Sequence, residues 1–160
     1  MRCLRFLQGF KAVPSLRGWL ESLGYAFLVI AIAFLIAPSL VDFNQRPPLD
    51  ELVRMSAIAF FVPALFEEAV FRGFLLLRFS PTWIALSSTA YVLWHPVEAL
   101  TFFPQSAIYF LDIRFLLIVS LLSLFCTLAY FRTRSIWASV WVHWLVVVAW
   151  KAAGGAQFVV

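Results

Sequence analysis

Two adjacent glutamates, Glu67 and Glu68, lie in a strongly apolar stretch, and Arg72 follows Glu68 by one helical turn. A charged side chain near the centre of a bilayer costs on the order of 3 kcal/mol. Three such groups in so short a stretch therefore have to pair, line a hydrated cavity or take part in chemistry. Arg72 shares a helical face with Glu68 and is expected to hold that carboxylate ionised. Glu67 points about 100° away from Glu68 and is expected to face a cavity.

The two histidines of the chain lie in other apolar stretches, His95 after Trp94 and His143 before Trp144. Depth in a membrane can be counted at about 1.5 Å per helical residue from the expected cytoplasmic edge of each span. This places the two glutamates roughly 16 Å deep, His95 roughly 21 Å deep and His143 roughly 12 Å deep. The four side chains are therefore expected to meet near the middle of the membrane, although they come from three separate segments.

Two carboxylates and two imidazoles support a short list of chemistries. A glutamate can activate water as a general base while a histidine orients that water or stabilises an oxyanion. The same residue types bind zinc, and a metal here would take Glu67, His95 and His143 as ligands. The spacing does not match His-Glu-x-x-His, so we predict no cofactor and keep a divalent metal such as zinc as an alternative. A proton relay in a carrier is the least favoured reading, because the chain has no internal repeat.

The elements that carry these residues follow from composition. The chain has 160 residues, of which 64% are hydrophobic and 12% are charged, against about 25% charged in soluble domains. Continuous apolar runs exclude the alternating pattern of a barrel, so we predict an all-α, polytopic transmembrane helical bundle in a single domain, residues 1–160. Five spans of roughly 20 apolar residues are expected. They run over about Ser22–Val41, Leu52–Leu77, Thr82–Leu100, Arg114–Phe131 and Ser135–Trp150.

The basic residues predict an orientation for this bundle, because cytoplasmic loops carry an excess of Lys and Arg. A cytoplasmic N-terminus places on that side Arg2, Arg5, Lys11, Arg17, Arg78, Arg132 and Arg134. The opposite side then receives Arg46, Arg54, Arg114 and Lys151. Residues 1–20 mix basic and apolar side chains and are expected to form an interfacial helix. We read the net charge of +4 as contact with the lipid bilayer and predict no nucleic-acid partner.

Three ordered motifs resemble one known family. Glu67-Glu68-x-x-x-Arg72 lies in Phe-Glu-Glu-Ala-Val-Phe-Arg-Gly-Phe-Leu, and Tyr91-x-x-x-His95 follows it. The third motif ends at His143, after Arg-Thr-Arg-Ser-Ile-Trp-Ala-Ser-Val-Trp-Val. Together they resemble the CPBP family, the group of CAAX prenyl endopeptidases and of bacteriocin-processing or abortive-infection membrane proteins. The resemblance covers a protease-like core of residues 52–150.

The resemblance implies an intramembrane endopeptidase of the glutamic type that acts on membrane-associated peptides or proteins. By that resemblance Glu67 is the general base that activates water, and His95 helps to hold the water. Glu68 and Arg72 support the site, His143 helps to stabilise the oxyanion, and Tyr91 is a supporting residue. An integral protein of a bacterial plasma membrane with a cytoplasmic N-terminus is expected.

The chain departs from the family pattern at one position. The family usually carries an asparagine four residues after the last histidine, and here that residue is Val147. Loss of an oxyanion donor typically costs about a hundredfold or more in turnover. Ser139, Trp94 and Tyr91 are alternative donors. Two functions are therefore kept: an active endopeptidase, and a catalytically weakened member that acts as a membrane immunity or partner-binding protein.

Overall fold

The structure is a computed structural model that describes residues 2–76 and 78–155, with the side chains of residues 2–6 left out. The described chain forms helices and helical turns, and no strand occurs in it. In order, these elements are α1 (Arg2–Lys11), α2 (Leu16–Ile36), the 3-10 turns η1 (Pro38–Leu40) and η2 (Phe43–Gln45), α3 (Leu49–Ala59), the π-helical η3 (Phe60–Leu65), α4 (Phe66–Glu68), the π-helical η4 (Ala69–Leu75), α5 (Pro81–Thr101), the 3-10 turn η5 (Pro104–Ser106), α6 (Ala107–Phe110), α7 (Ile113–Thr133) and α8 (Ile136–Ala152). The predicted all-α fold is confirmed.

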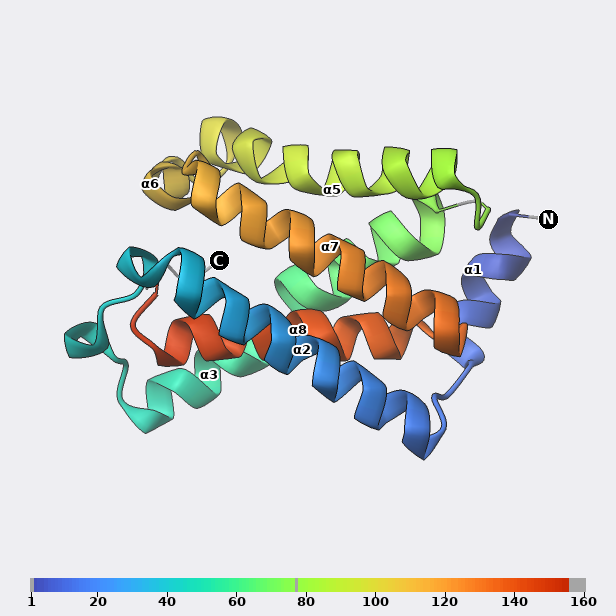
Figure 1. Ribbon diagram of the computed structural model, residues 1–160, viewed down its shortest axis with the longest axis horizontal. Helices are drawn as coiled ribbons and strands as arrows, with labels where there is room; N and C mark the ends of the chain where they lie inside the picture. The colour runs from blue at the N-terminus through green and yellow to red at the C-terminus, as the bar shows by residue number, and fades with distance from the viewer. Residues whose placement is uncertain (1, 77, 156–160) are drawn as a thin grey trace.

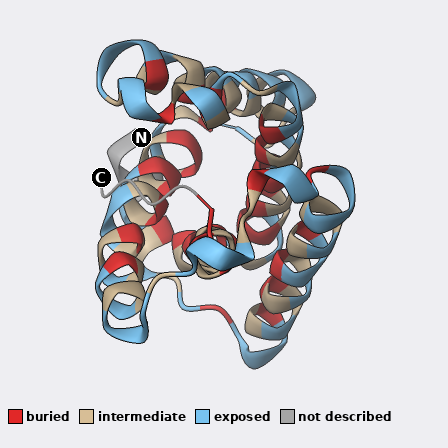
Figure 2. Cartoon of the chain, turned by 90° about the vertical axis from the view of Figure 1, so that its left-hand side faces the viewer, coloured by how far each residue is buried: buried red, intermediate tan, exposed pale blue. Residues whose placement is uncertain are grey.

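The helix α8 lies at the centre of the bundle and packs against α2, α7 and α3 (Figure 1). The helix α5 covers the other side of α7 and also contacts η4. Buried positions line the inner faces of the helices, while exposed positions cover the outside (Figure 2). The central helix of the bundle is thus the one that carries His143.

Two helices of the described residues, α2 and α7, are long and apolar enough to cross a bilayer, and α8 is a shorter apolar helix. The outer face of α2 exposes large apolar side chains such as Phe27 and Leu35, which are 63% and 80% exposed. Side chains of this kind suit contact with lipid tails. The first span is displaced from its predicted range. Because the hydroxyl oxygen of Ser15 accepts a hydrogen bond from the backbone N–H of Gly18, α2 begins before Ser22.

The second predicted span, Leu52–Leu77, is not one continuous helix. It is divided into α3, η3, α4 and η4, and residue 77 lies outside the described residues. The break is at Val62, whose backbone angles (φ −136°, ψ 111°) are not helical. Pro63 follows, and a proline disfavours the helical region for the residue before it. The two glutamates therefore lie on a short helical segment that begins after the break.

Candidate active site

Glu68 and Arg72 form a fully buried ion pair. The guanidinium Nη1 of Arg72 donates to Oε1 of Glu68 at 3.1 Å, and both side chains have zero exposure. The same carboxylate oxygen lies 3.0 Å from Nδ1 of His143. The predicted pairing of Glu68 with Arg72 is thus present in the structure. One oxygen of Glu68 is committed to two partners that come from η4 and α8.

Arg72 makes three further contacts, two with Ser123 and one with Tyr91. Its Nη2 donates to the backbone carbonyl of Ser123 at 2.9 Å and to the hydroxyl oxygen of Ser123 at 3.0 Å. Its guanidinium carbon lies 4.3 Å from the centre of the Tyr91 ring, which is a favourable cation–π distance. Arg72 therefore links η4 to α5 and α7 and also binds Glu68. These contacts indicate that Arg72 stabilises the fold around the site.

Glu67 is buried like Glu68, but its carboxylate has different neighbours. It is 2% exposed, and its Oε2 has no hydrogen-bond partner in the described residues. Nε2 of His143 lies 3.9 Å from that oxygen. An unsatisfied buried carboxylate oxygen is costly, so such a group is expected where a ligand or water completes its bonding. Glu67 also lines the cavity described below, whereas Glu68 does not.

The ring of His95 is oriented by its own helix. Nδ1 of His95 lies 3.2 Å from the backbone carbonyl oxygen of Tyr91, one turn earlier in α5. Because a carbonyl oxygen only accepts, Nδ1 is the protonated nitrogen of this pair. In the neutral ring Nε2 then carries a lone pair that is free to accept or to coordinate. His95 is 6% exposed and also lines the cavity.

Tyr91 and His143 complete the cluster. The hydroxyl oxygen of Tyr91 lies 3.5 Å from each ring nitrogen of His143, and the rings of Tyr91 and His95 pack edge to face. His143 faces both glutamates, with Nδ1 toward Glu68 and Nε2 toward Glu67. The six residues predicted from sequence for this site therefore lie together: Glu67, Glu68, Arg72, Tyr91, His95 and His143.

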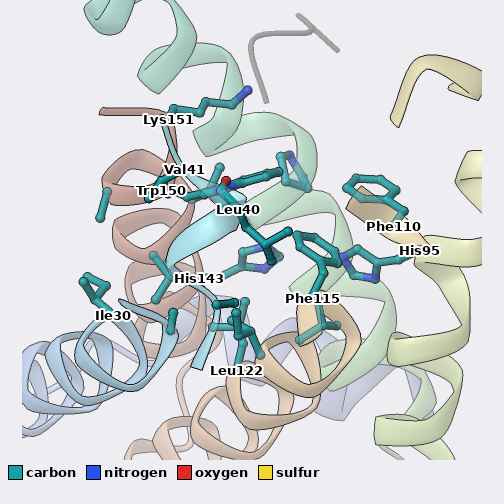
Figure 3. A pocket seen from close by; sticks show the side chains of 18 of the residues that line it. Ile30, Leu40, Val41, His95, Phe110, Phe115, Leu122, His143, Trp150 and Lys151 are labelled. Carbon is teal, nitrogen blue, oxygen red and sulfur yellow. The ribbon is translucent and has the colours of Figure 1, made fainter. Parts of the chain in front are cut away.

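A mainly apolar cavity of about 130 Å³ opens beside this cluster. Figure 3 shows His95 and His143 reaching it from two different helices, with Lys151 farther along its wall. Val147 is one of the lining residues. Glu98 lines the cavity as well. The walls come from α2, η3, α5, α7 and α8, so the cavity lies where most of the long helices meet.

A comparison with protein families matches residues 49–149 to the Rce1-like family of type II CAAX prenyl endopeptidases. The match covers more than half of the chain and includes every residue of the cluster. The chain belongs to this family. Comparisons with curated proteins and with solved structures gave no match. The prediction from the three motifs is confirmed at the level of the family, and with it the reading of the chain as a helical membrane protein.

Two residues of this Rce1-like site were not predicted from the sequence. Ser123 in α7 appears in the sequence as one serine in an apolar helix, and nothing in its surroundings there indicates that Arg72 reaches it. The second residue is Glu98, near the end of the third predicted span. It lies one turn after His95 in α5. A carboxylate oxygen of Glu98 lies within 4.8 Å of a carboxylate oxygen of Glu67 and of a ring nitrogen of His95. The spacing of three residues from His95 is the signal that could have indicated this.

Proposed function

We propose that this Rce1-like protein is an endopeptidase that hydrolyses peptide bonds of membrane-associated substrates with water activated by Glu67. The observation that carries the proposal is the contrast between the two glutamates. Glu68 is bound by Arg72 and His143 through Oε1 and does not line the cavity, while Glu67 lines the cavity; Oε2 of each carboxylate is buried without a hydrogen-bond partner among the described residues. A general base needs a free oxygen within reach of the water that it deprotonates.

In this proposal the water lies between Glu67 and His95. Glu67 takes one proton from the water as the water oxygen bonds to the carbonyl carbon of the scissile peptide. Nε2 of His95 accepts the other hydrogen of the water and fixes its direction, because Nδ1 is engaged by the carbonyl of Tyr91. The proton held by Glu67 is then delivered to the departing amine, so that a carboxylic acid and an amine are the products.

The oxyanion formed by this attack needs a donor. Nδ1 of His143 faces the carboxylate of Glu68, so Nδ1 carries the proton of the neutral ring. Nε2 can then donate to the oxyanion only when the ring is doubly protonated. Tyr91 is a second candidate donor, at 3.5 Å from His143. Ser139 is a poor one, because its hydroxyl donates to the carbonyl of Cys126 at 2.9 Å.

The test is cleavage of a farnesylated CAAX peptide, the substrate type in the family description, by purified protein in detergent with a chelator present. Glu67→Gln, His95→Ala and His143→Ala are expected to lose cleavage while unfolding at the wild-type temperature. An unfarnesylated peptide of the same sequence tests whether the prenyl group is required. Robust cleavage by the three folded variants would overturn the proposed mechanism.

A second candidate function is favoured by Val147. Because this apolar side chain lines the cavity where the family pattern has an amide donor, the chain is also a candidate for a catalytically weakened member that binds a partner or confers immunity. Val147→Asn separates the two. Cleavage that appears only in Val147→Asn supports the weakened member, whereas full turnover by the wild-type protein refutes it.

A further inference from the structure

The wall of the cavity carries a buried lysine, Lys151. This side chain is 6% exposed, and it lines the cavity together with the two histidines. Lysine is rarely buried to this extent, because burial removes water from the charged amine. An ammonium in apolar surroundings also attracts an anion more strongly than one in bulk water does. We propose that Lys151 binds the C-terminal carboxylate of the peptide substrate, an inference that rests on the proposed hydrolysis at Glu67.

Lys151 and the proposed reaction centre lie at different places along the cavity. Figure 3 shows His143 in the middle of the lining side chains and Lys151 at one end, with Leu40 and Val41 between them. Among the described residues that line the cavity, Lys151 is the only lysine or arginine. The carboxylate of a bound peptide is therefore attracted to this end and repelled by the like charge of Glu67, which lies beside His143.

The spacing along α8 sets the length of peptide that fits between the two places. Lys151 follows His143 by eight residues in α8, which is about 12 Å along the helix axis at about 1.5 Å per residue. An extended peptide advances about 3.3 Å per residue, so roughly three to four residues cover this distance. A CAAX sequence, from which the family takes its name, has three residues after the cysteine. One extended peptide can thus place the bond after its cysteine beside Glu67 and its carboxylate at Lys151.

The wall between these two places is apolar. Leu40, Val41 and Trp150 all line the cavity on the side of Lys151. Apolar side chains of the substrate gain free energy when they leave water for such a surface. The cavity therefore favours a peptide whose last residues are apolar and whose end is a free carboxylate.

The backbone of Lys151 is fixed by contacts on both sides of it. The backbone N–H of Gly154 donates to the carbonyl of Lys151 at 3.0 Å, and the indole N–H of Trp150 donates to the carbonyl of Leu40 at 3.1 Å. Lys151 lies in the last turn of α8, where the carbonyl ends of the helix favour a positive charge. A cation whose backbone is already in place loses less freedom when the peptide binds, which favours binding.

The first test measures peptide binding without hydrolysis. Glu67→Gln protein in detergent is titrated into two dansylated, farnesylated CAAX peptides that differ only in a free carboxylate or an amide at the C-terminus, and fluorescence anisotropy gives each Kd. The carboxylate peptide is expected to bind about ten- to a hundredfold more tightly, the strength of one charge-assisted hydrogen bond. Adding Lys151→Met should make the two Kd values equal, whereas Lys151→Arg should keep most of the difference.

Lys11→Met is the matched control. Lys11 is the other lysine of the chain and lies exposed at the end of α1, so its loss should leave the preference for the carboxylate peptide unchanged. Thermal unfolding shows that each variant is folded. The comparison of the two peptides on protein that keeps Lys151 does not depend on the folding of Lys151→Met.

The second test measures kcat/KM on protein that keeps Glu67. A C-terminal amide is expected to lower kcat/KM by about ten- to a hundredfold through KM, and Lys151→Met should remove this difference between the peptides. Equal Kd values for the two peptides on protein with Lys151, or a preference that folded Lys151→Met retains, would overturn the role of Lys151. A carboxylate preference that depends on Lys151, in a protein that cleaves neither peptide, would support that role and overturn only the proposed hydrolysis.

Discussion

At the scale of single residues, the neighbours Glu67 and Glu68 differ in what surrounds their carboxylates. Glu68 gives one oxygen to both Arg72 and His143, which links three elements of the bundle. Glu67 lines the cavity and Glu68 does not, although Oε2 of each is buried without a hydrogen-bond partner among the described residues. The rotation of about 100° between consecutive helical residues is sufficient to send one carboxylate into the packed interior and the other to the cavity.

Arg72 is predicted to be essential for stability. Its removal leaves Glu68 as a buried, uncompensated charge and leaves the carbonyl of Ser123 without its donor, so Arg72→Met should reduce the free energy of unfolding by about 3–5 kcal/mol. Ser123→Ala removes only the hydroxyl contact and should cost about 1 kcal/mol. Thermal unfolding in detergent measures both.

Arg17→Met is the matched control for Arg72→Met. The Arg17 side chain is 82% exposed and pairs with Glu21 on the surface of α2, so its loss should change the free energy of unfolding by no more than about 0.5 kcal/mol. If Arg72→Met unfolded at the same temperature as Arg17→Met, the structural role given to Arg72 would be wrong.

The residues of the cluster were largely predictable because charge inside an apolar run is expensive. That argument identifies Glu67, Glu68, Arg72 and the two histidines from sequence alone. It does not identify Ser123, because a hydroxyl in an apolar helix costs little and bonds to its own backbone as readily as to a neighbour. Glu98 follows His95 by three residues, and this helical spacing is the sequence signal that links it to the cluster.

At the scale of elements, the end of α8 is fixed by the chain that follows α2. The backbone N–H of Asp42 donates to the carbonyl of Gly154 at 3.2 Å, and the indole N–H of Trp150 donates to the carbonyl of Leu40 at 3.1 Å. Leu40, Trp150 and Lys151 also line the cavity. This contact therefore shapes one wall of the candidate active site.

Gly154 is predicted to be intolerant of substitution. Its φ of +77° is rarely adopted by residues with a side chain, and an added Cβ would overlap the carbonyl oxygen of Asp42. Gly154→Ala should therefore reduce the free energy of unfolding by about 1–3 kcal/mol. Gly24→Ala in α2 is the control, because nothing lies within 4 Å of its added Cβ. It should raise stability by up to about 1 kcal/mol.

These two glycine variants are compared by thermal unfolding in the same detergent. A Gly154→Ala protein as stable as Gly24→Ala would contradict the close approach of α8 to Asp42.

Among the elements themselves, the apolar runs predicted the positions of α2, α5, α7 and α8 to within several residues. The break in the second span depends on Pro63, whose effect on Val62 is local and is not visible in the apolar pattern.

At the scale of the whole molecule, the two ends of the bundle are held by different polar contacts. At one end Arg132 pairs with Glu21 at 2.6 Å, and the indole of Trp137 donates to the carbonyl of Phe10. At the other end Arg114 donates to the hydroxyl of Ser39 at 2.8 Å. The end that carries α1 is the one that the sequence places in the cytoplasm, an orientation that stays a prediction.

That orientation is tested by cysteine labelling in intact cells. In a chain with Cys3→Ser and Cys126→Ala, a single cysteine is introduced as Gln8→Cys or as Gln45→Cys. A membrane-impermeant maleimide should label the cysteine at position 45 in intact cells and the cysteine at position 8 only after lysis, because the excess of basic residues favours a cytoplasmic N-terminus. The reverse labelling pattern would refute this topology.

The measurement that tests the central claim most directly is kcat for Glu67→Gln, compared with Glu51→Gln, on the farnesylated peptide in chelator. If Glu67 is the base that activates water, kcat of Glu67→Gln should fall by about 10²–10⁴, while KM and the unfolding temperature stay near wild type. Glu51→Gln should keep the wild-type kcat, since Glu51 lies on α3 outside the cluster. A folded Glu67→Gln protein that turns over at the wild-type rate would contradict the account.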